Sequence, residues 1–155
     1  MKRIIYSATF LIITFLALAA TNSESCDTKA LKKQGIAELN PYFYSAAKVN
    51  TISYDYKETR KEIEVPLFKG EKYKMVFNKK ALPKDVVIEV YDKDKENTNR
   101  SPIFSSADST GTLVTFEPKK SKKMYVNYVI PEAGDVKETG CLVFILGYQL
   151  TFLKD

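Results

Sequence analysis

The chain has 155 residues, of which 45% are hydrophobic and 28% are charged, and its formal net charge is +5. This length and composition predict one domain with a core of its own, and so small a net charge gives little support to nucleic-acid binding. The absence of histidine excludes Ser-His-Asp and Cys-His catalytic sites and removes the commonest metal ligand.

The N-terminus has the pattern of a cleaved secretory signal peptide. Lys2 and Arg3 precede an apolar run from Phe10 to Leu18, and small residues follow it. We therefore expect residues 1–20 to be removed during export to the periplasm or the extracellular space, with contact to the membrane only through this segment. Two alternatives stay open, which are a retained membrane anchor and a lipid attached to Cys26.

The two cysteines, Cys26 and Cys141, lie near the two ends of the mature chain. In an exported protein, an even pair of cysteines is more often a disulfide than two free thiols. We therefore predict a Cys26–Cys141 disulfide that ties the N-terminal segment to the last strand. Two unpaired thiols, one exposed and one buried, are the alternative.

Residues 21–47 are predicted to form one short helix and an aromatic segment. Asp27 is a candidate N-cap, and apolar residues at helical spacing follow it for about ten residues. Gly35 weakens this helix, Asn40-Pro41 ends it, and the aromatic residues Tyr42-Phe43-Tyr44 come next.

From residue 48 to the C-terminus, apolar and polar residues alternate with the period of β-strands. The expected strands lie at residues 52–56, 63–67, 73–77, 86–90, 102–106, 113–116, 124–130 and 141–152. The last is apolar on both faces and should be central in its sheet, whereas Pro66 places its strand at an edge or ends it. We expect a turn over 78–84 and an exposed loop over 92–101. Seven or eight strands separated by Gly and Pro turns predict an all-β fold, an antiparallel β-sandwich over residues 48–155.

Candidates for catalysis and metal binding are few. Glu62 and Glu64 share one face of a predicted strand, which a carboxylate-based hydrolase could use, although an amphipathic strand would place both in solvent. Asp92–Asn97 has alternating acidic residues, as calcium loops do, but Lys93 and Lys95 would repel a cation. There is no Gly-rich phosphate loop or dinucleotide fingerprint. We therefore expect a protein that is not an enzyme and has no metal or cofactor, and leave calcium at this loop open.

Two groups of side chains are candidates for binding. The first is a compact basic turn formed by Lys119, Lys120, Lys122 and Lys123. It could attract an anionic polymer or surface, or simply keep the strand ends soluble. The second is a group of tyrosines, Tyr42, Tyr44, Tyr54 and Tyr56. They could stack on sugar rings or anchor a protein interface, or they could border the core.

Several segments between Gly70 and Tyr148 resemble the bacterial pre-peptidase C-terminal domain and its collagen-binding relatives. The matching segments are Gly70–Phe77, Val86–Asp92, Phe116–Pro118, Met124–Val126 and Gly140–Phe144. The resemblance covers more than half of the mature chain, which also looks like other small exported bacterial proteins. It implies a jelly-roll-like β-sandwich that binds matrix, sugars or partner proteins. The chain lacks the attached protease and the acidic calcium-binding linker of those relatives, so we extend neither calcium nor matrix binding to it.

These observations predict a non-catalytic exported module, binding or structural, of the bacterial cell envelope or its surroundings. The expected partner is an envelope or secreted protein. A carbohydrate-binding module that uses surface tyrosines is the alternative, with a glycan as its ligand, and a carboxylate-based hydrolase is the less favoured one. Fold-level resemblance does not by itself assign a function.

Overall fold

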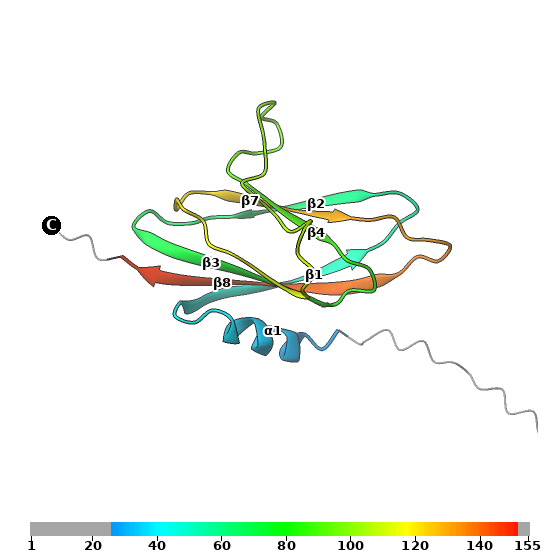
Figure 1. Cartoon of the computed structure of the whole chain (residues 1–155), viewed down its shortest axis with the longest axis horizontal. Coiled ribbons are helices and arrows are strands. Elements are labelled where there is room, and N and C mark those ends of the chain that lie inside the picture. The colour runs from blue at the N-terminus through cyan, green and yellow to red at the C-terminus, as the bar shows by residue number, and fades with distance from the viewer. Residues whose placement is uncertain (1–25, 152–155) are drawn as a thin grey trace, which may run out of the picture.

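A computed structural model describes residues 26–151 as two four-stranded antiparallel sheets packed face to face, with one helix on the outside (Figure 1). The first sheet has the strand order β1 (Phe43–Ser53), β8 (Thr139–Leu150), β3 (Glu71–Ala81) and β6 (Leu113–Phe116). The second has the order β2 (Thr59–Val65), β7 (Met124–Ile130), β4 (Val87–Tyr91) and β5 (Phe104–Ser105). The predicted β-sandwich is confirmed. The predicted signal peptide lies outside the described residues.

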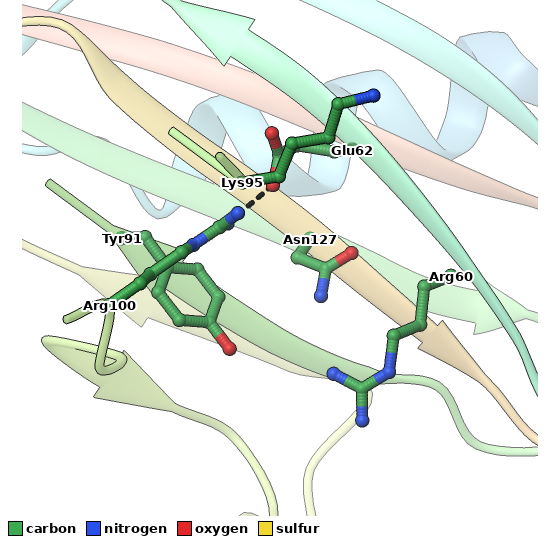
Figure 2. Close-up of a pocket in the computed structure, with 6 residues that line it drawn as sticks. All are labelled: Arg60, Glu62, Tyr91, Lys95, Arg100 and Asn127. Carbon is green, nitrogen blue, oxygen red and sulfur yellow. Dashed lines mark hydrogen bonds and ion pairs between the residues drawn. The ribbon is translucent and has the colours of Figure 1, made fainter. Parts of the chain in front are cut away.

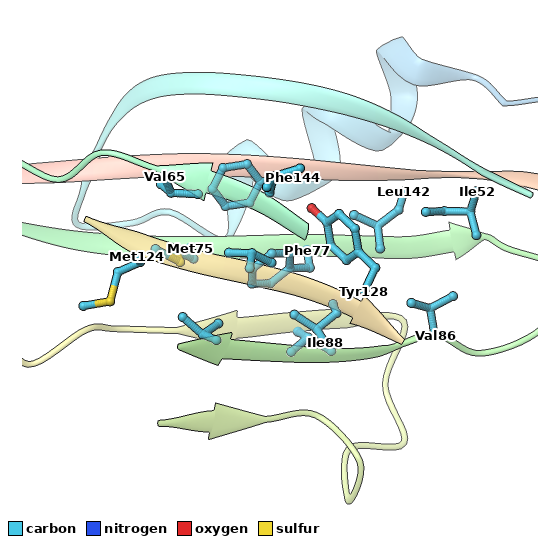
Figure 3. Packing of buried hydrophobic residues seen from close by; sticks show 14 of the residues in the cluster. Ile52, Val65, Met75, Phe77, Val86, Ile88, Met124, Tyr128, Leu142 and Phe144 are labelled. Carbon is cyan, nitrogen blue, oxygen red and sulfur yellow. The ribbon is translucent and has the colours of Figure 1, made fainter. Parts of the chain in front are cut away.

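The core between the sheets comes from alternate residues of almost every strand (Figure 3). Its largest members are completely or almost completely buried, among them Tyr54, Phe77, Ile88, Tyr128 and Leu142. The one polar atom of Tyr128 is satisfied, since the Nδ2 of buried Asn50 donates to its hydroxyl over 3.3 Å. The alternation along the strands therefore gives a continuous apolar layer, as the sequence predicts.

The helix α1 (Thr28–Ala37) covers the outer face of the first sheet. The predicted N-cap is confirmed, because the Oδ1 of Asp27 accepts a hydrogen bond of 3.0 Å from the Ala30 N–H. The predicted disulfide is confirmed as well, and the Cα atoms of Cys26 and Cys141 are 5.9 Å apart. It joins the residue before this N-cap to β8. Among residues 26–151, no helix is long and apolar enough to cross a membrane.

The double-sided burial of β8 follows from this arrangement. Its inner residues enter the core between the sheets, and its outer residues Val143 and Ile145 pack beneath the helix with Leu31. A Cβ atom on Gly35 would overlap the side chain of Ile145. The glycine that we expected to weaken the helix thus allows α1 to pack directly against β8. The prediction of a central last strand is confirmed.

Several strand boundaries differ from the prediction. The strand expected over residues 52–56 is wrong in its bounds, because β1 begins at Phe43 and ends at Ser53. A register shift between Tyr44 and Ala46 interrupts the period of two that marks a strand. The turn expected over residues 78–84 is wrong in part, because β3 continues to Ala81. Asn78 is buried there and its Nδ2 donates to the Leu31 carbonyl, so a polar residue inside the strand serves to hold the helix.

The edge position predicted by Pro66 is confirmed. The strand β2 ends at Val65, directly before the proline, and it forms one edge of the second sheet. Gly70 has a φ of +93°, a conformation that favours glycine, in the turn that leads into β3. The loop of residues 92–103 follows β4, and its Lys95 and Arg100 lie beside residues of β2, β4 and β7 on the outer face of the second sheet.

Candidate functional site

The basic turn between β6 and β7 borders a cleft of about 390 Å³, which we call the lysine cleft. Its rim carries three of the four predicted lysines, Lys119, Lys120 and Lys122. Its floor is apolar and consists of Ile103, Phe116 and Met124. Phe116 belongs to β6, an edge strand of the first sheet, and Met124 to β7, an inner strand of the second, so both sheets contribute to the cleft.

The floor of the lysine cleft is held in place by the core. The ring of Phe116 stacks on that of Phe104, with the ring centres 4.8 Å apart, and Met124 is buried. The Ile103 N–H donates to the Val90 carbonyl over 2.8 Å, while the Ile103 side chain stays 45% exposed. An apolar surface therefore remains accessible on a rigid base, and covering it with another apolar group would be favourable.

The cations on the rim differ in their partners. The Nζ of Lys122 lies 2.7 Å from the Oδ2 of Asp92, and this contact is the main reason that the pKa of Asp92 is lowered. Lys119 and Lys120 have no carboxylate within 4.0 Å among residues 26–151. The cleft therefore combines an apolar floor with two free positive charges. An anionic group that carries an apolar part would complement both.

The fourth predicted lysine belongs to a different surface. The Nζ of Lys123 lies 3.0 Å from the Glu64 carboxylate, which raises the pKa of this lysine. Glu62 and Glu64 do share the outer face of β2, as predicted, but Glu62 is paired with Arg100. Each carboxylate is thus neutralised by its own cation rather than held as a pair.

Two of the predicted tyrosines use their hydroxyl groups inside the protein. Tyr54 is 1% exposed and its hydroxyl donates to the Lys84 carbonyl over 2.5 Å, so its ring is part of the core. The Tyr42 hydroxyl donates to the Glu117 carboxylate over 2.8 Å. Burial and this hydrogen bond raise the pKa of Tyr42. Glu117 also lines the lysine cleft, which places Tyr42 beside it.

The other two tyrosines are exposed but lie far apart. Tyr44 is 42% exposed near the start of β1, and Tyr56 is 65% exposed just beyond the end of that strand. A strand rises by about 3.3 Å per residue, so the intervening chain separates them by roughly 30 Å. A lysine ammonium, that of Lys32 or of Lys137, lies 4.9 Å from the centre of each ring. The four predicted tyrosines therefore do not form one surface.

Sequence reasoning missed a polar hollow on the outer face of the second sheet (Figure 2). This arginine hollow has a volume of about 420 Å³ and is lined by Arg60, Glu62, Tyr91, Lys95, Arg100 and Asn127. Arg100 lies in the segment that we expected to be an exposed loop, yet its side chain is only 12% exposed. Its partner Glu62 is 38 residues away in the chain, and no local pattern marks such a pair.

Comparison with known proteins does not add a family. No protein-family model matches the chain, and no curated protein matches it. What stands of the predicted resemblance is the fold, a two-sheet antiparallel sandwich of eight strands. Within the part of the chain that the structure describes, no group of three or more Cys, Asp and Glu side chains is placed to hold a metal ion.

Proposed function

We propose that the protein is a non-catalytic exported binding module whose lysine cleft receives an acidic segment of a partner protein. The observation that carries the proposal is the combination of the apolar floor with the unpaired Lys119 and Lys120. The Cys26–Cys141 disulfide is consistent with export, because such bonds persist in oxidising compartments.

The chemistry of the cleft favours a peptide over a simple anion. An apolar side chain of the partner would cover Ile103 and Phe116, while neighbouring carboxylates would meet Lys119 and Lys120. Buried apolar anchors supply most of the affinity in protein interfaces, and exposed charges at the rim mainly supply orientation and speed of association. The volume of about 390 Å³ falls in the range of ligand sites, roughly 300–1,000 Å³.

A carbohydrate site built from the predicted tyrosines is the less favoured function. Stacking on a sugar chain needs several exposed rings on one surface. Tyr54 is buried, and Tyr44 and Tyr56 lie at opposite ends of β1. A hydrolase is less favoured too, since Glu62 and Glu64 are engaged by separate cations.

The proposal can be tested with labelled peptides and fluorescence anisotropy. The first peptide alternates Glu with Leu and Phe, and the second keeps the Glu residues but replaces the apolar ones by Ser. We expect the first to bind more tightly and the double variant Lys119→Gln/Lys120→Gln to weaken it at least tenfold. Ile103→Ser should weaken it as well, because that change removes part of the floor.

The matched control is Lys137→Gln, which removes an exposed lysine that pairs with Asp55 outside the cleft. It should leave peptide affinity unchanged. Equal affinity for both peptides, or an equal loss in the control and in the double variant, would contradict the proposal. Cross-linking to native envelope proteins, repeated with the same variants, then identifies the physiological partner.

A further inference from the structure

We propose that the arginine hollow is a second binding site, which recognises a carboxylate-bearing sugar. The site is independent of the lysine cleft, because the two share none of their lining residues. Its residues come from β2, β4, β7 and the loop of residues 92–103 (Figure 2).

The part of the wall formed by Arg100, Tyr91 and Glu62 is held in place before any ligand arrives. The guanidinium carbon of Arg100 lies 3.7 Å from the centre of the Tyr91 ring, and its Nη2 is bonded to the Glu62 carboxylate. Side chains fixed by stacking and by ion pairs lose little conformational entropy when a ligand binds. Because Arg100 covers the Tyr91 ring, this ring does not offer that face to a sugar, and recognition would rest on charge and hydrogen bonds.

The floor of the hollow is organised around one carboxylate. The Oε2 of Glu89 accepts hydrogen bonds from Arg60 (3.2 Å), from the Tyr91 hydroxyl (2.7 Å) and from the Nδ2 of Asn127 (3.2 Å). Because its Nδ2 donates to Glu89, the side-chain amide of Asn127 has a defined orientation. No hydrogen bond to its Oδ1 is found among the described residues, so this oxygen can accept one from a ligand.

Charge decides which ligand fits. The lining contains three cations, of which Arg100 is paired with Glu62, and Arg60 is paired with both Glu89 and Glu58. The third cation, Lys95, has no ion pair among residues 26–151, so its charge is available to a ligand. An anionic ligand is therefore favoured over a neutral one.

The acceptors in the hollow distinguish a sugar acid from a phosphate. A phosphate or sulfate offers almost only acceptor oxygens and would be repelled by the Glu62 carboxylate. A sugar acid brings a carboxylate for Lys95 and Arg60 and also hydroxyl groups that can donate to Glu62 and Asn127. A hydroxylated carboxylate thus matches both kinds of group that line the site.

The test is isothermal titration with galacturonic acid, its tetramer and neutral galactose tetramer. We expect the acidic ligands to bind, the neutral one to bind at least tenfold more weakly, and affinity to fall as salt rises. Binding of the monomer as tightly as the tetramer would identify a free sugar acid. Binding that grows with chain length would identify a polymer.

The variants separate the site from general charge effects. Lys95→Gln should weaken binding about fivefold, the effect of one exposed ion pair of about 1 kcal/mol, and Lys95→Gln/Arg60→Gln should abolish it. The matched control is Lys93→Gln, in the same loop, whose Nζ donates to the Asn99 carbonyl and which does not line the hollow. The proposal is overturned if the control loses as much affinity as Lys95→Gln, if inorganic phosphate binds as well as galacturonic acid, or if none of the acidic sugars binds.

Discussion

Lys79 and Asp85 form an ion pair in which the cation is buried and the anion is exposed. The Nζ of Lys79 lies 2.5 Å from the Oδ1 of Asp85, and the two side chains are 3% and 62% exposed. A buried ammonium group without a partner is costly, because it has lost its hydration. The exposed carboxylate of Asp85 therefore offsets the lost hydration of the buried Lys79 ammonium group.

We expect Asp85→Asn to lower the free energy of unfolding by about 2 kcal/mol, the scale of a lost hydrogen bond to a charged group. Urea unfolding followed by circular dichroism would measure this change. The control is Asp108→Asn, which alters an exposed acid of a nearby loop and should change stability by less than about 0.5 kcal/mol. Equal losses in the free energy of unfolding for the two substitutions would show that the ion pair does not contribute to stability.

Most strands could be predicted because they alternate apolar and polar residues along their length, and β8 could be predicted from a run that is apolar on both faces. The places where prediction fails are those where a distant segment changes the local pattern. The register shift beside Tyr44 breaks the alternation in β1. Asn78 is a polar residue that can be buried within β3 because its side-chain amide donates to the Leu31 carbonyl of the helix. Neither partner lies close to these residues in the sequence.

The candidate sites show the same division. The lysines of the cleft lie within residues 119–122 and were found from the sequence, whereas the floor joins Ile103, Phe116 and Met124 from separate segments. The arginine hollow depends on Arg100 returning to Glu62 across the sheet. Pairings of this kind depend on the packing of the whole sandwich, which local spacing does not encode.

Gly35→Ala tests the close approach of α1 to β8. In an isolated helix this substitution would stabilise by about 1 kcal/mol. Here the new Cβ would overlap the Cδ1 of completely buried Ile145, and its Cγ1 would be only 3.2 Å away. Overpacking of a core costs about 1–3 kcal/mol, so we expect a net loss of about 1 kcal/mol in urea unfolding.

A double-mutant cycle with Ile145→Val identifies the cause of this loss. Valine lacks the Cδ1 atom, so the cost of Gly35→Ala should fall, or become a gain, in the Ile145→Val background. Additive effects of the two substitutions would mean that the helix adjusts to the extra methyl group without contact with Ile145.

The Cys26–Cys141 disulfide should contribute strongly to stability because it closes a long loop. The two residues are 115 positions apart, and chain entropy assigns about 4–5 kcal/mol to a loop of that size. We expect the Cys26→Ser/Cys141→Ala variant to lose about this much in guanidinium unfolding. Amide exchange should accelerate first in α1, which the disulfide ties to β8. A loss below about 1 kcal/mol would contradict this account.

The buried hydroxyl of Tyr54 predicts a loss of stability in alkaline solution. Burial raises the pKa of Tyr54 from 10.0 to about 12 and is the main cause of that shift. In the unfolded chain the group ionises near 10, so between pH 10 and 12 the unfolded state binds fewer protons than the folded state. The contribution of Tyr54 to the free energy of unfolding should therefore be independent of pH below about pH 10. It should fall by roughly 2 kcal/mol as the pH rises from 10 to 12.

Tyr54→Phe isolates this contribution. The variant loses the hydrogen bond to the Lys84 carbonyl at every pH, so the slope of stability against pH is the quantity to compare, not its value. We expect the slope between pH 10 and 12 to become shallower, though not zero, because burial also raises the pKa of Tyr128. Tyr56→Phe, at an exposed ring, should keep the slope of the unmodified protein. If Tyr54→Phe also keeps it, the hydroxyl ionises in the folded state as easily as in the unfolded chain.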